Sequence, residues 1–128
     1  MATPHIIDVH HHFVPEAYKE ALSAAGDACP PPGFQPPLRQ WNASRSIEEM
    51  DKAGIASALV SITTPGIHFG DDARARILAR ACNEAGAQMM VDHRLRFGLF
   101  AALPLPDIDA SLDEIGRASC RERVFRTV

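Results

Sequence analysis

The sequence Ile6-Ile7-Asp8-Val9-His10-His11-His12 joins a short apolar run directly to three consecutive histidines. A β-branched run of this length, apolar on both faces, predicts a buried strand of a parallel sheet. The histidines follow at the carboxyl end of that strand, which is the edge where parallel α/β barrels carry their active sites. This position makes the three histidines the leading candidates for a functional site.

The alternation of side chains along a strand assigns these residues to two faces. Asp8, His10 and His12 fall on one face, with Val9 and His11 on the other. Neighbours on one face lie about 6.6 Å apart, so two imidazoles can lean toward one ion at about 2.0–2.1 Å from each. We therefore predict His10 and His12 as metal ligands and His11 as non-ligating, with Asp8 orienting a histidine ring rather than binding metal directly.

A chance or tag-like histidine cluster is the alternative to a metal site. A purification tag would lie outside the folded pattern, whereas these histidines continue a strand. The position of the cluster therefore favours the metal interpretation.

The rest of the chain alternates between helical and strand periods. Helices are predicted over residues 15–26, 46–54, 71–91 and from 110, strands over 55–62 and 97–103, and a proline-rich loop over 27–45. Ser46 and Glu49 have the spacing of a capping box, Asp71 suits an N-cap, and Asp107 or Asp109 would cap the last helix. The order indicates βαβαβ topology with parallel strands.

Three parallel strands cannot close a barrel, because a (β/α)₈ barrel typically needs about 250 residues. The fold class is therefore α/β, with about three βα units of a metal-dependent (β/α)₈ TIM barrel. A small doubly wound sheet is the structural alternative, although the first βα turn lacks the glycine-rich phosphate loop of a dinucleotide-binding fold.

The helix at 71–91 carries one apolar stripe, formed by Ala73, Ile77, Leu78, Ala81, Cys82, Ala85 and Met89. Cys82 is predicted as a small buried hydrophobe rather than a nucleophile. Asn83 and Glu84 are predicted as polar residues at the surface or between helices, and Gly86 as a tolerated flaw.

The composition limits the classes of protein that need to be considered. The chain has 128 residues, of which 46% are hydrophobic and 23% charged, as expected for one soluble globular domain. The formal charge of −3 argues against a nucleic-acid partner. No run approaches the roughly 20 apolar residues of a membrane span, and no signal peptide is recognised, so we expect a cytoplasmic protein without a membrane partner.

The last residues break with the preceding pattern. Residues 115–124 read IGRASCRERV, which resembles the translation of a sequencing-adapter oligonucleotide. We therefore expect residues 1–114 to form the native part and residues 115–128 to be a non-native tail. Without that tail, nine basic and fifteen acidic side chains remain, and the formal charge is −6.

Four stretches resemble the amidohydrolase-2 family, which includes aminocarboxymuconate-semialdehyde decarboxylase and related aromatic-acid decarboxylases. The stretches are Ile7–Pro15 (IDVHHHFVP), Glu49–Ile55 (EMDKAGI), Cys82–Glu84 (CNE) and Arg96–Pro106 (RFGLFAALPLP). They follow the order and approximate spacing of the family and cover nearly all of residues 5–114. The His-x-His pair alone is less specific, because PHP phosphoesterases and TatD-type nucleases also open a barrel with it.

The resemblance implies a distorted (β/α)₈ barrel that binds a divalent metal, Zn²⁺ or Mn²⁺, with His10 and His12 as two of the ligands. The family takes a further histidine from a middle strand and an aspartate from the last strand, and neither is present here. The implied activity is decarboxylation of a small carboxylic acid, aromatic or derived from an aromatic compound. A homodimeric parent protein is left open.

Three further residues are candidates for binding the substrate. Trp41 and Arg45 flank the proline-rich loop and would wall a pocket for a carboxylated aromatic ring, and His68 follows the second strand on the catalytic side. A packed aromatic, a solvated arginine and an exposed loop histidine are the alternatives.

Two other functions stay open from the sequence. A metal-dependent hydrolase of the same superfamily would use a metal-bound water as the nucleophile. An inactive truncated chain with two weak metal ligands is the third hypothesis.

Overall fold

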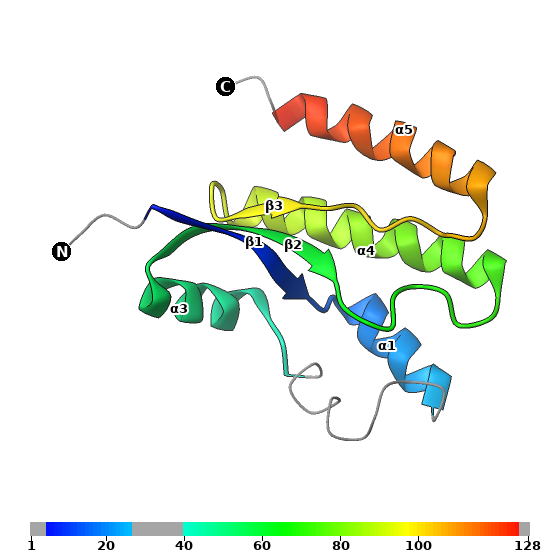
Figure 1. The fold of residues 1–128 in the computed structure, drawn as a ribbon, viewed down its shortest axis with the longest axis horizontal. Coiled ribbons are helices and arrows are strands. Elements are labelled where there is room, and N and C mark those ends of the chain that lie inside the picture. Colours follow the sequence, from blue (N-terminus) through cyan, green and yellow to red (C-terminus); the bar gives the residue numbers. More distant parts are fainter. Residues whose placement is uncertain (1–4, 27–39, 126–128) are drawn as a thin grey trace.

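The computed structural model describes residues 5–26 and 40–125, with side chains to residue 118. The elements in chain order are β1 (Ile6–Phe13), α1 (Glu16–Ala25), α3 (Ala43–Ala53), β2 (Ile55–Ile62), α4 (Asp72–Asp92), β3 (Phe97–Leu99) and α5 (Ile108–Phe125) (Figure 1). Most of the predicted loop at 27–45 lies outside the described residues. None of the helices described is both long and apolar enough to cross a membrane.

The three strands form one parallel sheet in the order β1-β2-β3. Met50 of α3 and Met89 of α4 share one hydrophobic cluster with Ala58 and Val60 of β2. Because Ala58 and Val60 lie on the same face of β2, both helices cover that face of the sheet. Consecutive parallel strands with helices on a single face form a segment of a (β/α)₈ barrel, so the predicted fold class is confirmed and the doubly wound alternative is wrong.

The prediction that the first strand is buried is wrong for the described chain. The side chains of Ile7 and Val9 are 63% and 62% exposed. The reason is that α3 and α4 pack on the other face of the sheet, so neither of these helices covers the side chains of Ile7 and Val9. The face opposite the helices is called the open face below.

The ends of the helices follow the local sequence, with one exception. Asp71 caps α4 by accepting a hydrogen bond from the Arg74 N–H, and Asp107 does the same for the Ala110 N–H of α5. The predicted cap at Ser46 is wrong. Asn42 caps α3 instead by accepting from the Arg45 N–H, so the helix begins at Ala43 and includes Ser46.

The buried face of α4 is rotated relative to the predicted stripe. Ile77 is 72% exposed, and the buried residues are Ala75, Leu78, Ala79, Cys82, Asn83, Gly86 and Met89. Gly86 is more than a tolerated flaw, because a Cβ atom there would lie 2.7 Å from Cδ1 of Leu99. The sheet and helix thus approach each other closely at this glycine.

Strand β3 is shorter than predicted, because the backbone of Ala102, beyond its end, bonds to the side chain of Asn83 instead of to a neighbouring strand. Asn83 is only 4% exposed, its Oδ1 accepts from the Ala102 N–H at 2.7 Å, and its Nδ2 donates to the Ala102 carbonyl at 2.9 Å. The amide thus bonds to both polar groups of Ala102, as a neighbouring strand would. Of the two predicted roles of Asn83, the surface role is wrong, and the role between helices is confirmed by its hydrogen bond to Glu114 of α5.

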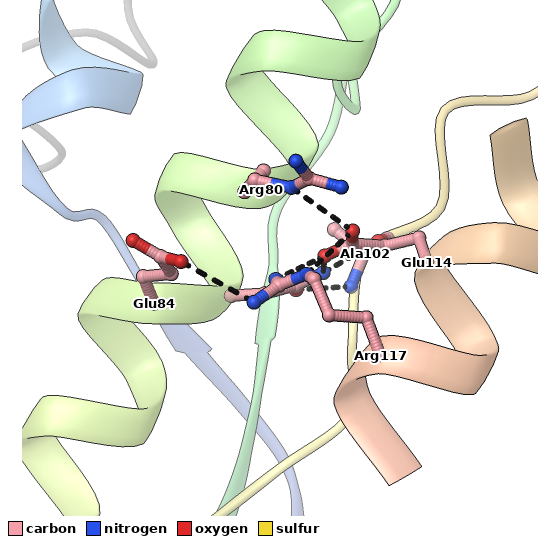
Figure 2. A network of polar contacts seen from close by, with 6 residues as sticks. Arg80, Glu84, Ala102, Glu114 and Arg117 are labelled. Atoms are coloured by element: carbon pink, nitrogen blue, oxygen red, sulfur yellow. Dashed lines mark hydrogen bonds and ion pairs between the residues drawn. The ribbon is translucent and has the colours of Figure 1, made fainter. Parts of the chain in front are cut away.

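A polar network joins α4 to α5 around the buried carboxylate of Glu114. Glu114 accepts a hydrogen bond from Asn83 Nδ2 at 2.9 Å and forms ion pairs with Arg80 and Arg117. Figure 2 shows Arg117 reaching back from α5 to Glu84 of α4, 3.2 Å away. Arg117 belongs to the stretch predicted to be a non-native tail, so these contacts cross that predicted boundary.

The pairing of Asn83 with Ala102 predicts a large loss of stability in Asn83→Ala. The variant leaves the Ala102 N–H and carbonyl without their partner, which costs about 2–3 kcal/mol of unfolding free energy. Urea denaturation followed by circular dichroism measures this change. Gln88→Ala is the matched control on the exposed side of α4 and should stay within about 0.5 kcal/mol. Equal midpoints for the two variants would contradict the assigned role.

Candidate metal centre

Strand β1 contains one extra residue relative to β2 where the histidines begin. Asp8 pairs with Ala58 and His11 pairs with Val60, so the step along β1 is one residue longer than the step along β2. Such a β-bulge shifts the alternation of faces for the residues beyond it. Asp8 and His11 therefore point to the same side of the sheet, which is the side covered by the helices.

His10 and His12 face each other on the open face. Their Nε2 atoms lie 3.1 Å apart, and their ring centroids are 4.9 Å apart with the planes at 87°. Both residues are exposed at the carboxyl end of β1. The structure thus brings the two predicted ligands together through the nitrogen atoms that would bind a metal.

The geometry of this pair fits a divalent ion. An ion held about 2.05 Å from both nitrogens would be bound at roughly 100°, between the angles of tetrahedral and octahedral coordination. At 3.1 Å, two neutral imidazoles either share a cation or form a hydrogen bond in which one ring donates to the other. The same positions of the two rings are therefore compatible with a bound ion and with a direct hydrogen bond between the rings.

The backbone of β2 offers a hydrogen-bond acceptor to the ring of His12. The Nδ1 atom of His12 lies 3.3 Å from the Ser61 carbonyl oxygen, which can only accept a hydrogen bond. The Ser61 hydroxyl oxygen lies 3.4 Å from the same atom and can donate or accept. In the tautomer whose Nδ1 donates to the carbonyl, the lone pair of Nε2 is free on the side of His10. A second hydrogen bond of this kind commonly orients a histidine that binds metal.

His11 lies on the opposite side of β1, in agreement with its predicted face. Its Nδ1 lies 3.0 Å from Asp8 Oδ2 and its Nε2 lies 2.6 Å from the hydroxyl oxygen of Ser46 in α3. Asp8 Oδ1 also accepts a hydrogen bond from the His10 N–H at 3.0 Å. The prediction that Asp8 shares a face with His10 and His12 is wrong because of the bulge, and the ring that Asp8 contacts is that of His11.

The hydrogen bond from the His11 ring lowers the pKa of the Asp8 carboxyl below its ordinary value, and the hydrogen bond from the His10 backbone lowers it further. Asp8 is therefore a carboxylate near neutral pH. Its two oxygen atoms accept hydrogen bonds from the His10 N–H and from the His11 ring.

The described part of the chain supplies only a pair of candidate ligands. No group of three or more His, Cys, Asp or Glu side chains that could hold a metal occurs within it.

A cavity of about 470 Å³ lies between the end of β1 and the start of α3. Its lining includes His12, Trp41 and Arg45, so two of the three candidate substrate-binding residues adjoin a candidate metal ligand. Trp41 also packs edge-to-face on Phe13, with ring centroids 6.1 Å apart. Arg45 is exposed, which leaves its guanidinium accessible from the cavity.

The third candidate, His68, lies apart from this cavity. Its Nε2 is 2.7 Å from Asp72 Oδ1, and its Nδ1 accepts a hydrogen bond from the Gly70 N–H. His68 thus holds the loop before α4 against the first turn of that helix. A larger cavity of about 620 Å³ lies between α4 and α5 and contains none of the predicted site residues.

Two contributors to the site were not recognised from the sequence. The Ser61 carbonyl is a backbone group, and no residue type signals it. The Ser46 hydroxyl was assigned to a helix cap, and only the tertiary contact between α3 and β1 reveals its bond to His11.

The chain matches no protein-family model. It is 39% identical over 113 residues to the decarboxylase yanB of Aspergillus niger, covering 84% of this chain and 30% of that protein. It is 38% identical over 111 residues to the 6-methylsalicylic acid decarboxylase acuB of Aspergillus aculeatus, covering 85% of this chain and 32% of that protein. The chain therefore spans about a third of the length of these curated relatives.

A solved structure shares the fold. The dihydroxybenzoic acid decarboxylase of Polaromonas sp. superposes with a TM-score of 0.73 at 27% identity, over 90% of this chain and 35% of that chain. That protein was solved with bound manganese and the inhibitor 2-nitroresorcinol.

Cys82 is expected to be inert, as the sequence predicted. It is fully buried, and burial raises the pKa of its thiol to about 12. Because the thiolate is the reactive form, Ellman's reagent at about pH 8 should not react with Cys82 in a folded chain that carries Cys29→Ser and Cys120→Ser. The same chain in urea should react fully. Equal rates in the two conditions would contradict the buried, protonated thiol.

Proposed function

We propose that this chain supplies three βα units of a metal-dependent decarboxylase, because its homologues are decarboxylases of the amidohydrolase-2 family. The observation that carries the proposal is the 3.1 Å approach of the Nε2 atoms of His10 and His12 at the carboxyl end of β1. The proposed substrate is a small aromatic carboxylic acid.

Four residues of this chain would have separate roles in binding the metal and the substrate. His10 and His12 would hold a divalent metal, which when bound stabilises the negative charge that develops as CO₂ leaves. The Ser61 carbonyl would accept the Nδ1 proton of His12 and so favour the tautomer whose Nε2 can bind metal. Arg45 would bind the substrate carboxylate, since a guanidinium and a carboxylate form paired charge-assisted hydrogen bonds.

Trp41 would form a wall of the substrate site. Its indole packs on Phe13 and against two clusters of buried residues, one around Met50 of α3 and one around Tyr18 of α1. It therefore presents a fixed apolar surface at the cavity. A planar aromatic substrate packs well on such a surface. His68 is not part of this proposal, because its ring is engaged by Asp72 and Gly70 outside the cavity.

Decarboxylation is preferred over hydrolysis because the curated relatives above are decarboxylases. Manganese is the first choice of metal, since the related Polaromonas enzyme was solved with it, and zinc remains the alternative. We also propose a cytoplasmic location. With two candidate ligands in the described part, we expect the 128-residue chain alone to be inactive.

The metal role predicts a specific loss of binding when either imidazole is removed. Mn²⁺ or Zn²⁺ titrated into the chain should bind at least about tenfold more weakly to His10→Ala and to His12→Ala, because a single imidazole remains. Isothermal titration calorimetry measures the affinity. His68→Ala is the matched control and should bind like the unaltered chain. Equal affinities in all variants would refute the metal site.

The role of Arg45 predicts weaker binding of carboxylated aromatics. NMR titration with 2,6-dihydroxybenzoate should show about a tenfold loss of affinity in Arg45→Ala, because a charge-assisted hydrogen bond contributes roughly 1.5 kcal/mol. Arg74→Ala, an exposed arginine of α4, is the control and should leave the affinity unchanged. A loss of the same size in both variants would indicate nonspecific charge attraction instead.

A further inference from the structure

A chain of hydrogen-bonding side chains connects β1 to α3 on the side of the sheet away from His10 and His12. Asp8 Oδ2 lies 3.0 Å from Nδ1 of His11, and Nε2 of His11 lies 2.6 Å from the hydroxyl oxygen of Ser46. Both nitrogens of the His11 ring are therefore engaged. A ring held at both nitrogens is fixed in its orientation.

Ser46 and Asp8, the two outer residues of this hydrogen-bonded series, are each held by further contacts. Ser46 is 7% exposed, and Met50, one turn later on α3, is fully inside the hydrophobic cluster beneath the sheet. At the other end, the Asp8 carboxylate also accepts the His10 N–H at 3.0 Å. The side chain of His11 thus binds the bulge to α3, and the side chain of Asp8 forms a hydrogen bond within the bulge.

These hydrogen-bonded side chains lie next to the candidate metal ligands in the sequence of β1. His11 is the residue between His10 and His12, and the extra residue of β1 lies between Asp8 and His11. Because neighbouring side chains of a strand point to opposite faces, holding His11 toward α3 sends the rings of His10 and His12 to the open face. Among the described strands, β1 pairs with β2 alone, so no second described strand fixes the position of His11.

We propose that Ser46 and Asp8 are positioning residues that fix the bulge through His11 and thereby aim His10 and His12 at a common ion. The inference rests on the proposed function for the metal site and adds two residues to it. Neither residue touches the ion, so the effect passes through the backbone of β1.

The test compares Zn²⁺ affinity, the visible spectrum of the Co²⁺-loaded chain and the far-ultraviolet circular dichroism. Ser46→Ala should weaken Zn²⁺ binding about tenfold and change the Co²⁺ band, because the imidazoles lose their fixed angle, while the dichroism stays unchanged. Ser46→Thr keeps the hydroxyl and should restore both readings. Ser44→Ala, an exposed serine on the same helix, is the matched control and should match the unaltered chain.

The outcomes separate this inference from the proposed function. If His10→Ala and His12→Ala weaken binding but Ser46→Ala does not, the positioning role is overturned and the metal site stands. If the two histidine variants bind like the unaltered chain, both proposals fail.

If Ser46→Ala does not fold, Asp8→Ala is the second test variant, because it removes the hydrogen bond on the other side of His11. Weaker Zn²⁺ binding in a folded Asp8→Ala chain supports the proposal. Unfolding of both variants overturns it, because the contacts would then serve stability alone.

Discussion

The parallel pairing of β1 with β2 constrains every side chain at the candidate metal site, because the register decides which face a residue occupies. One extra residue between Asp8 and His11 sends Asp8 to the side of the helices and leaves His10 and His12 on the other side. On one side, polar contacts bind the strand to α3. On the other, two imidazole nitrogens approach each other without steric interference from that helix.

The elements that depend on local sequence could be predicted. Gly54 ends α3 in the left-handed conformation with φ of 70°, Asp71 caps α4, and the apolar run at 55–62 forms β2 with the predicted bounds. Each of these depends on the preference of one residue or one short period. The order of strands and helices followed from the same local signals.

The errors arose where a distant partner decided the outcome. The continuation of β3 was predicted as strand to residue 103, but Ala102 bonds to the amide of Asn83, 19 residues earlier in the chain. Ser46 bonds to His11 from 35 residues away, which a capping pattern does not reveal. The approach of His10 to His12 could be predicted because both residues belong to one strand, whereas the place of Asp8 required knowing the pairing with β2.

The uncovered apolar residues of β1 have a consequence during biosynthesis. Relatives of this chain are about three times as long, and a ribosome adds about 5–20 residues per second. In a protein of that length, Ile7 and Val9 would emerge tens of seconds before the last segments are made. Throughout that interval their side chains would be accessible to chaperones that recognise nascent apolar surfaces.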